Sequence, residues 1–228
     1  FNGGMGGSAQ ARRNAPRQGN DVRYELRLTF EEAAKGCHKS VEFYRYENCA
    51  TCGGSGAKPG TQPQTCSMCK GTGQIRQSGG WMTTVRTCPA CGGSGKVIKD
   101  KCSSCGGSGR VRMRRTLELD VPAGVDDNIV LSKRGQGEPG ANGGPNGDLL
   151  IQITVKPHKL FRREGTNLRL EVPISFTQAA LGAEIDVPTL DGSVKYTIPE
   201  GTQTDTEFRI RSKGIQQLGS NNKGDLIF

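Results

Sequence analysis

Apolar and polar residues alternate in a short stretch near the start of the chain. The apolar positions of this stretch are Val22, Tyr24, Leu26, Leu28 and Phe30. A period of two residues is typical of a β-strand that buries one face. Thr29 and Glu32 form the sequence signature of a capping box, and Gly36 supplies a stop signal. The pattern therefore predicts a strand followed directly by one short helix, TFEEAAKG.

The same pattern returns 146 residues further along the chain. Its alternating apolar positions are Leu168, Leu170, Val172, Ile174 and Phe176. Ser175 and Gln178 repeat the capping box, and Gly182 repeats the stop. We therefore expect a second strand and a second short helix, SFTQAALG, built on the same plan.

A further set of matches runs at an offset of 77 residues. The matched pairs are Pro122 and Pro199, Gly124 and Gly201, Arg134 and Arg211, Gly137 and Gly214, Gly147 and Gly224, Asp148 and Asp225, and Leu149 and Leu226. The alternating residues Leu117, Leu119 and Val121 likewise match Val194, Tyr196 and Ile198. The two offsets differ by 69 residues, so an insertion of that length between about Tyr46 and Arg115 reconciles them. This indicates a duplicated, mostly β domain whose first copy is interrupted.

These registers predict the domain boundaries. Residues 1–20 lack periodicity and are rich in Gly, Asn, Gln and Arg, which is typical of a flexible linker. The first β domain spans residues 21–46 and 115–157, and residues 47–114 form the inserted module. The second β domain spans residues 158–228, and the last residue, Phe228, corresponds to Ile151 within a predicted strand of the first copy. We therefore expect the second domain to be truncated at its C-terminus.

The inserted module contains four C-x-x-C pairs: Cys49 and Cys52, Cys66 and Cys69, Cys88 and Cys91, and Cys102 and Cys105. Glycines follow each pair two and four residues after its second cysteine, as in CATCGGSG and CSMCKGTG. Two such pairs supply four thiolates, the ligand set of a structural zinc site. The glycines allow backbone dihedrals that turn N–H groups toward the sulfur atoms. We therefore predict two zinc ions per chain, held in closed sites with no position free for catalysis.

Spacing favours one way of sharing eight cysteines between two sites. Eighteen residues separate Cys69 from Cys88, within the usual window of a zinc ribbon. Nested pairing follows, with the second and third pairs in one site and the first and fourth in the other. The sequential alternative leaves gaps of 13 and 10 residues, shorter than that window. The ninth cysteine, Cys37, lies outside every pair and is expected to be a small buried residue.

Composition changes this picture in two respects. The chain has 34 Gly and 9 Cys among 228 residues, with 33% hydrophobic and 5% aromatic residues. One large core is therefore unexpected, and several small modules fit better. The net charge of +9 suggests an anionic partner, but eight thiolates with two Zn²⁺ lower it to about +5. The odd cysteine count, the C-x-x-C pairing and the lack of a secretion signal favour metal in a reducing cytosol over disulfides.

Four consecutive C-x-x-C-x-G-x-G repeats inside one copy of a duplicated β domain resemble the bacterial DnaJ family with a cysteine-rich region. The resemblance extends to VPAGVDD (121–127), NGDLLIQITVKPHKLFRREG (146–165), ALGAEIDVPTLDG (180–192) and IPEGTQTDTEFRIRSKG (198–214). It implies two tandem β-sandwich domains of the DnaJ C-terminal type, with a zinc-ribbon-like module inserted in the first. It also implies nested zinc sites: Cys49, Cys52, Cys102 and Cys105 as zinc 1, and Cys66, Cys69, Cys88 and Cys91 as zinc 2.

The resemblance further implies a co-chaperone rather than an enzyme. Such proteins bind unfolded polypeptide clients in an exposed apolar groove, at positions that match Leu26, Val41, Phe43, Leu117 and Ile151. From the residues alone, these five side chains are also compatible with an ordinary core. The family delivers clients to a DnaK-type ATPase through an N-terminal J domain that this chain lacks, because His38 and His158 are each followed by Lys.

The remaining expectations concern location, assembly and competing functions. We expect a cytoplasmic protein without a membrane span, since no apolar run approaches about 20 residues. The resemblance implies a homodimer for the full-length protein and a monomer for this piece. Two other functions use the same cysteines. A nucleic-acid-binding zinc ribbon predicts binding with steep salt dependence, and a thiol–disulfide oxidoreductase predicts reactive C-x-x-C thiols.

Overall fold

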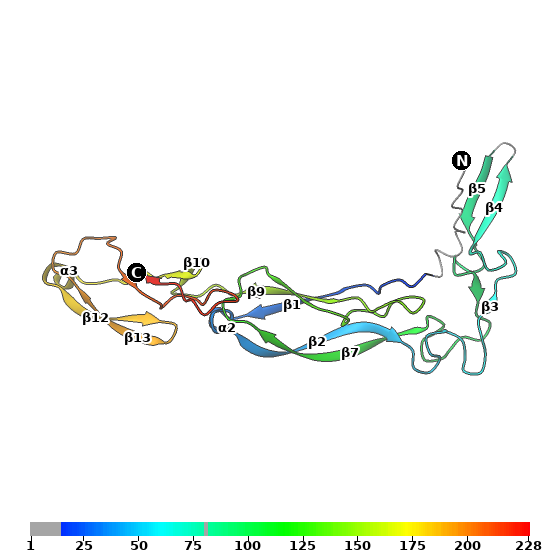
Figure 1. Cartoon of the computed structure of the whole chain (residues 1–228), viewed down its shortest axis with the longest axis horizontal. Coiled ribbons are helices and arrows are strands. Elements are labelled where there is room, and N and C mark those ends of the chain that lie inside the picture. The colour runs from blue at the N-terminus through cyan, green and yellow to red at the C-terminus, as the bar shows by residue number, and fades with distance from the viewer. Residues whose placement is uncertain (1–14, 80–81) are drawn as a thin grey trace, which may run out of the picture. The chain divides into compact units, whose positions relative to one another are not determined.

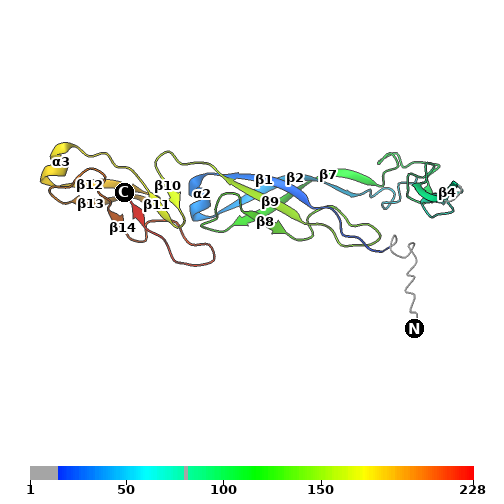
Figure 2. The same cartoon turned by 90° about the horizontal axis from the view of Figure 1, so that it is seen from above.

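The computed structural model describes residues 15–79 and 82–228, and this part of the chain is mostly β (Figures 1 and 2). Its helices are α2 (Phe30–Lys35) and α3 (Phe176–Leu181). Its strands are β1 (Val22–Leu28), β2 (Cys37–Asn48), β3 (Gln64–Thr65), β4 (Gln74–Gly79), β5 (Met82–Thr87), β6 (Lys96–Val97), β7 (Arg110–Val121), β8 (Val130–Lys133), β9 (Leu149–Val155), β10 (Arg162–Glu164), β11 (Asn167–Arg169), β12 (Ala183–Thr189), β13 (Gly192–Ile198), β14 (Arg209–Ile210) and β15 (Leu226–Ile227). Within these residues, neither helix is long and apolar enough to cross a membrane.

The duplication predicted from sequence is visible in the order of the strands. One sheet has the order β1-β9-β8, and another has the order β10-β11-β15-β14. At the two sequence offsets, β1, β9 and β8 correspond to β11, β15 and β14, so the second sheet repeats the first and adds β10. Each copy also has a two-stranded ribbon, β2-β7 in the first and β12-β13 in the second. We therefore name residues 21–46 with 115–157 the first repeat, and residues 158–228 the second repeat.

Both short helices begin and end as the sequence predicts. The Thr29 hydroxyl accepts the Glu32 N–H, and the Glu32 carboxylate accepts the Thr29 N–H; Ser175 and Gln178 repeat this arrangement in α3. Gly36 and Gly182 end the two helices with φ of 78° and 74°. A Cβ on either glycine would lie 2.9 Å from a carbonyl oxygen of the following ribbon. Glycine is therefore required twice for the same reason, at equivalent places.

One predicted strand is shorter than expected. Burial alternates from Leu168 to Ile174, but only Asn167–Arg169 pairs as a strand, β11. Pro173 lies within the unpaired remainder, and a proline has no N–H to donate to a neighbouring strand. The alternation therefore predicts the buried face correctly but overestimates the hydrogen-bonded length.

The last residues of the predicted linker form backbone hydrogen bonds with another segment of the chain. Residues 1–14 lie outside the described part of the chain. Arg17 and Ala141 exchange two backbone hydrogen bonds of 3.0 and 2.9 Å, and the Asn20 carbonyl accepts the Glu138 N–H at 2.9 Å. A Cβ on Gly144 would lie 2.0 Å from the Arg17 carbonyl oxygen, so glycine permits this close approach. Residues 17–20 are therefore paired with the glycine-rich loop that precedes β9.

The chain forms two compact units. The described residues of 1–22, 42–115 and 132–150 form one unit, and residues 23–41, 116–131 and 151–228 form the other. The first unit contains the cysteine-rich module, and the second contains helix α2 together with the whole second repeat. These boundaries differ from the predicted domain boundaries, so the three-module division remains a prediction from the repeat.

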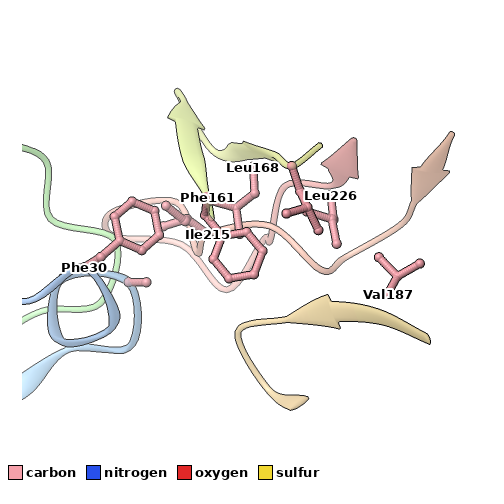
Figure 3. Packing of buried hydrophobic residues seen from close by; sticks show 8 residues of the cluster. Phe30, Phe161, Leu168, Val187, Ile215 and Leu226 are labelled. Carbon is pink, nitrogen blue, oxygen red and sulfur yellow. The ribbon is translucent and has the colours of Figure 1, made fainter. Parts of the chain in front are cut away.

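A buried cluster of the second unit explains why α2 belongs to it. Phe30 and Ala34 of α2 join a buried cluster with Phe161, Leu168, Leu170, Val187, Ile215 and Leu226. Figure 3 shows the Phe30 ring extending from the α2 helix toward Phe161 and Ile215, and Val187 on the β12 ribbon facing the sheet that carries Leu226. The β12-β13 ribbon and the four-stranded sheet therefore enclose a small sandwich core, and α2 closes one end of it.

Candidate metal centres

The first and fourth C-x-x-C pairs form one cluster. The sulfur atoms of Cys49, Cys52, Cys102 and Cys105 all lie within 4.8 Å of one another. The Sγ atoms are 3.9 Å apart for Cys49 and Cys102 and 3.8 Å apart for Cys52 and Cys105. The Cys49 N–H donates to the Gly109 carbonyl at 2.9 Å, so the two ends of the module are tied together where β2 leads in and β7 leads out.

The second and third pairs form the other cluster. The sulfur atoms of Cys66, Cys69, Cys88 and Cys91 also lie within 4.8 Å of one another. The Sγ atoms of Cys66 and Cys88 are 3.9 Å apart, and those of Cys69 and Cys91 are 3.7 Å apart. The short β3-β6 pairing and the β4-β5 hairpin flank this cluster in the chain. The cysteines are thus grouped in the nested order that their spacing favours, and the sequential order is not found.

The sulfur spacing fits zinc. Tetrahedral zinc with Zn–S bonds of about 2.3 Å places its sulfur ligands roughly 3.8 Å apart. The four Sγ distances of 3.7–3.9 Å match this value. A disulfide instead requires about 2.05 Å, and all nine cysteines are free thiols in the structure. The two four-cysteine clusters are therefore consistent with two zinc ions.

The glycine that follows each C-x-x-C pair orients the backbone toward sulfur. The N–H groups of Gly56, Gly73, Gly95 and Gly109 donate to the second sulfur of their own pair at 3.2–3.3 Å. A Cβ on Gly109 would lie 2.3 Å from the Gly54 carbonyl oxygen, and one on Gly56 would lie 2.4 Å from the Gly107 carbonyl oxygen. The two pairs of this cluster therefore pack backbone against backbone, and only glycine leaves room for that contact.

The thiols within each cluster differ in acidity. Burial raises the pKa of Cys52, but the Gly56 N–H and other hydrogen bonds outweigh it and lower this pKa to about 6. The same balance, with the Gly73 N–H, lowers the pKa of Cys69 to about 6. Burial raises the pKa of Cys88 to about 11. Zinc requires thiolates, so binding at neutral pH releases protons from the less acidic members.

The residues predicted to contact clients are mostly buried. Leu26, Val41, Phe43 and Ile151 are 7%, 0%, 4% and 0% exposed, and Leu117 is half-buried. Four of the five side chains are therefore covered in the structure, and their contact with clients stays a prediction. Their strands alternate as predicted, but the apolar face is the packed inner face, as in the core interpretation.

An open apolar groove lies in the second repeat. It has a volume of about 290 Å³, and the half-buried residues Val172, Ile174, Ile185, Phe208 and Phe228 line it, with a polar rim at residues 202–206. Val172 and Phe228 are the repeat counterparts of Leu26 and Ile151 at the two sequence offsets. The sequence analysis did not identify this groove, although the two offsets already match Val172 and Phe228 to two of the predicted client-contact residues.

Comparisons with known proteins were consistent with this architecture. The family model described as "DnaJ C terminal domain" matches residues 22–228. A protein of Ruminiclostridium cellulolyticum named "Chaperone protein DnaJ" is 53% identical over 226 residues, covering 97% of this chain and 59% of the relative. Proteins of the same name from Acetivibrio thermocellus and Geobacillus kaustophilus are 51% and 52% identical over 229 and 225 residues, covering 99% and 97% of this chain. This chain covers 59% of each of those two relatives as well.

Proposed function

Because this chain belongs to the family of DnaJ C-terminal domains, we propose that it is a binding module for unfolded polypeptide, stabilised by two structural zinc ions. Its relatives are named as chaperones. The observation that carries the proposal is the pair of closed four-sulfur clusters within a chain that matches this family from residue 22 to residue 228. A protein that acts by binding needs exposed apolar surface, and the groove of the second repeat provides some.

The zinc ions act structurally in this proposal. Cys49, Cys52, Cys102 and Cys105 would hold one ion, and Cys66, Cys69, Cys88 and Cys91 the other. Bound zinc contributes folding free energy to a Gly-rich segment that has little apolar surface to bury. Four sulfurs complete the tetrahedral shell, which leaves no position for a catalytic water. This favours a binding function over an enzymatic one, and the same geometry favours metal binding over thiol–disulfide exchange.

Clients are proposed to bind as extended segments through apolar side chains. Main-chain hydrogen bonds to a strand accept any sequence, and shallow apolar grooves select hydrophobic residues. The groove lined by Val172, Ile174, Ile185, Phe208 and Phe228 supports this in the second repeat. In the first repeat, Leu117 is the accessible member of the predicted set. Contact with Leu26, Val41, Phe43 and Ile151 would require the strands around them to open.

We propose that the full-length protein transfers clients to a DnaK-type ATPase chaperone. We also propose that it forms a dimer and is located in the cytoplasm. These parts rest on the family resemblance. The chain spans 59% of the length of the first relatives it matches, so experiments on this chain address zinc and client binding.

Zinc content and suppression of aggregation test the proposal together. We expect about two zinc ions per purified chain and slower aggregation of a chemically denatured protein when the chain is added in excess. A purified chain that contains no zinc, or an aggregation rate that does not depend on the concentration of the chain, would contradict the proposal.

Photo-crosslinking locates the client without disturbing the core. A benzophenone amino acid at Thr204, on the groove rim, is expected to crosslink to a denatured client. The matched control places it at Asp186, which is exposed on β12 and does not line the groove. A third position, Leu117, reports on the first repeat. Equal yields at Thr204 and Asp186 would reject the groove and leave the zinc proposal intact.

A further inference from the structure

His158 lies where the first repeat passes into the second and contacts both. It follows β9 in the segment Lys156–Pro157–His158, and its side chain is 22% exposed. The imidazole stacks on Phe161 with ring centroids 5.0 Å apart and an interplanar angle of 25°. It also contacts Phe30 of α2, with centroids 5.5 Å apart. The ring is therefore held between an aromatic residue of each repeat.

The hydrogen bonds of this ring fix the role of each ring nitrogen. Nδ1 accepts the backbone N–H groups of Leu160 and Phe161, both at 3.1 Å. Nε2 lies 3.1 Å from a carboxylate oxygen of Glu31 in α2. Nδ1 must carry a lone pair to accept, so the proton is on Nε2, which donates to Glu31. The ring thus caps residues 160–161 as an Asn or Asp side chain caps a turn.

The second proton of an imidazolium is incompatible with this cap. Protonated Nδ1 is a donor and would face two N–H donors at 3.1 Å. Glu31 remains a partner for Nε2, because its pKa is lowered, first by its own backbone N–H and to a smaller extent by His158. Protonation therefore removes the bonds to residues 160–161 and keeps the one to α2.

We propose that His158 is a pH-sensitive positioning residue that fixes Phe161 against Phe30 when its ring is neutral, and that acid releases this contact between the two repeats. Phe161 is 5% exposed and belongs to the same buried cluster as Phe30, and Figure 3 shows its ring between Phe30 and other residues of the second repeat. Movement of residues 160–161 therefore loosens the end of the core that α2 closes. This proposal does not depend on client binding.

A cavity beside His158 gives the released segment somewhere to move. It has a volume of about 400 Å³, and Phe30, Val155, Pro157 and Phe161 form its apolar lining. Asp126 and Asp127 of the loop after β7, Lys156 of the same segment, and Arg162 and Arg163 of β10 are the charged groups that line it with His158. Arg163 is already held by the carbonyls of Val125 and Gly124 at 2.6 and 2.8 Å. The loop after β7 therefore stays attached to the second repeat when the histidine cap opens.

Nuclear magnetic resonance from pH 8 to pH 5 tests the proposal. The chain has two histidines, so a His38→Asn variant leaves His158 alone to titrate. We expect the imidazole to be the Nε2–H tautomer at high pH. The Leu160 and Phe161 amide shifts should follow the ring with the same midpoint, and their protection factors should fall by about tenfold, as expected for losing a hydrogen bond.

A His158→Asn variant provides the matched control. The Asn oxygen can accept the same two N–H groups but does not titrate in this range, so the pH response should disappear while the cap remains. Constant amide shifts and protection while the His158 ring titrates would overturn the proposal, as would an unchanged response in His158→Asn. If His158→Asn does not fold, the titration of His38→Asn decides alone.

Discussion

At the scale of single residues, glycine decides whether the cysteines meet. Each metal cluster needs N–H groups turned toward sulfur and two backbones in contact. Gly109 has φ of 72° and no room for a Cβ, whereas Gly106 has φ of 62° with nothing within 4 Å of its Cβ position. The two glycines follow the same cysteine pair. A substitution at Gly106 therefore tests backbone strain alone, whereas one at Gly109 tests strain together with steric overlap.

Replacing these glycines should weaken the first metal cluster to different degrees. Gly106→Ala adds only left-handed strain, about 1 kcal/mol. Gly109→Ala adds overlap with the Gly54 carbonyl and should cost clearly more. The measurement is zinc release to a chromophoric chelator, with the second cluster as internal reference. Equal release rates for the two variants would contradict the packing argument.

The capping carboxylate Glu32 should make helix α2 sensitive to acid. Its pKa is lowered from 4.5, first by the hydrogen bond from Lys39 and then by the Thr29 N–H. A lowered pKa means that its stabilisation is complete above about pH 4.5 and is lost as pH falls through the lower folded value. Glu32→Gln should reduce the protection of the Ala33 amide at pH 7, by up to about 1 kcal/mol.

That difference should shrink as the pH falls through the lowered pKa of Glu32, because the wild-type carboxyl then becomes protonated as well. Hydrogen exchange of the Ala33 amide, which bonds the Thr29 carbonyl at 3.1 Å, is the measurement. Glu200→Gln, at an exposed position, is the control. A difference that stays constant while the Glu32 carboxyl becomes protonated would mean that the carboxylate charge has no part in the cap.

At the scale of elements, the two helices show what duplication preserves and what it does not. Helices α2 and α3 share a capping box, a terminal glycine and a phenylalanine at the first position. Phe30 is 7% exposed and Phe176 is 87% exposed. The difference arises because Phe30 packs on His158 and Phe161, while Phe176 projects from its repeat.

Replacing these two phenylalanines by alanine should therefore reduce the stability of the core by very different amounts. Phe30→Ala should destabilise the core of the second unit by about 3 kcal/mol or more, whereas Phe176→Ala should change it by less than about 0.5 kcal/mol. Native-state hydrogen exchange at the Leu168 amide, which bonds the Asp225 carbonyl, reports on that core. Similar losses in both variants would show that α2 does not close the core.

At the scale of the whole molecule, different forces stabilise different parts. The second unit has a buried apolar cluster of eight residues. The buried cluster around the second metal site consists of cysteines, with Ile75 and Val97 packed beside them. A segment with so little apolar surface depends on metal for its folding free energy.

Removing zinc should therefore unfold the module and spare the second repeat. A strong chelator is expected to release two equivalents of zinc and to collapse the amide dispersion of residues 49–109. Amides of β12 and β13 should keep their shifts and protection. Loss of both sets of signals together would show that the second repeat depends on the metal sites.

The sequence by itself determined the features that depend on local pattern and on spacing. Capping boxes at Thr29 and Ser175, the two repeat registers and the nested cysteine groups could all be predicted, because they need only neighbours in the chain or a fixed loop length. Periodicity also predicted which face of β1 is buried.

Only the tertiary structure decided what covers each apolar face. The same sequence pattern gave a buried Phe30 and an exposed Phe176, and it gave buried positions at Val41 and Phe43 where a groove was expected. It also left the pairing of Arg17 with Ala141 unforeseen. Alternation shows that a face is apolar, but burial depends on which distant segment packs against that face, and a repeat copies the element without copying its neighbour.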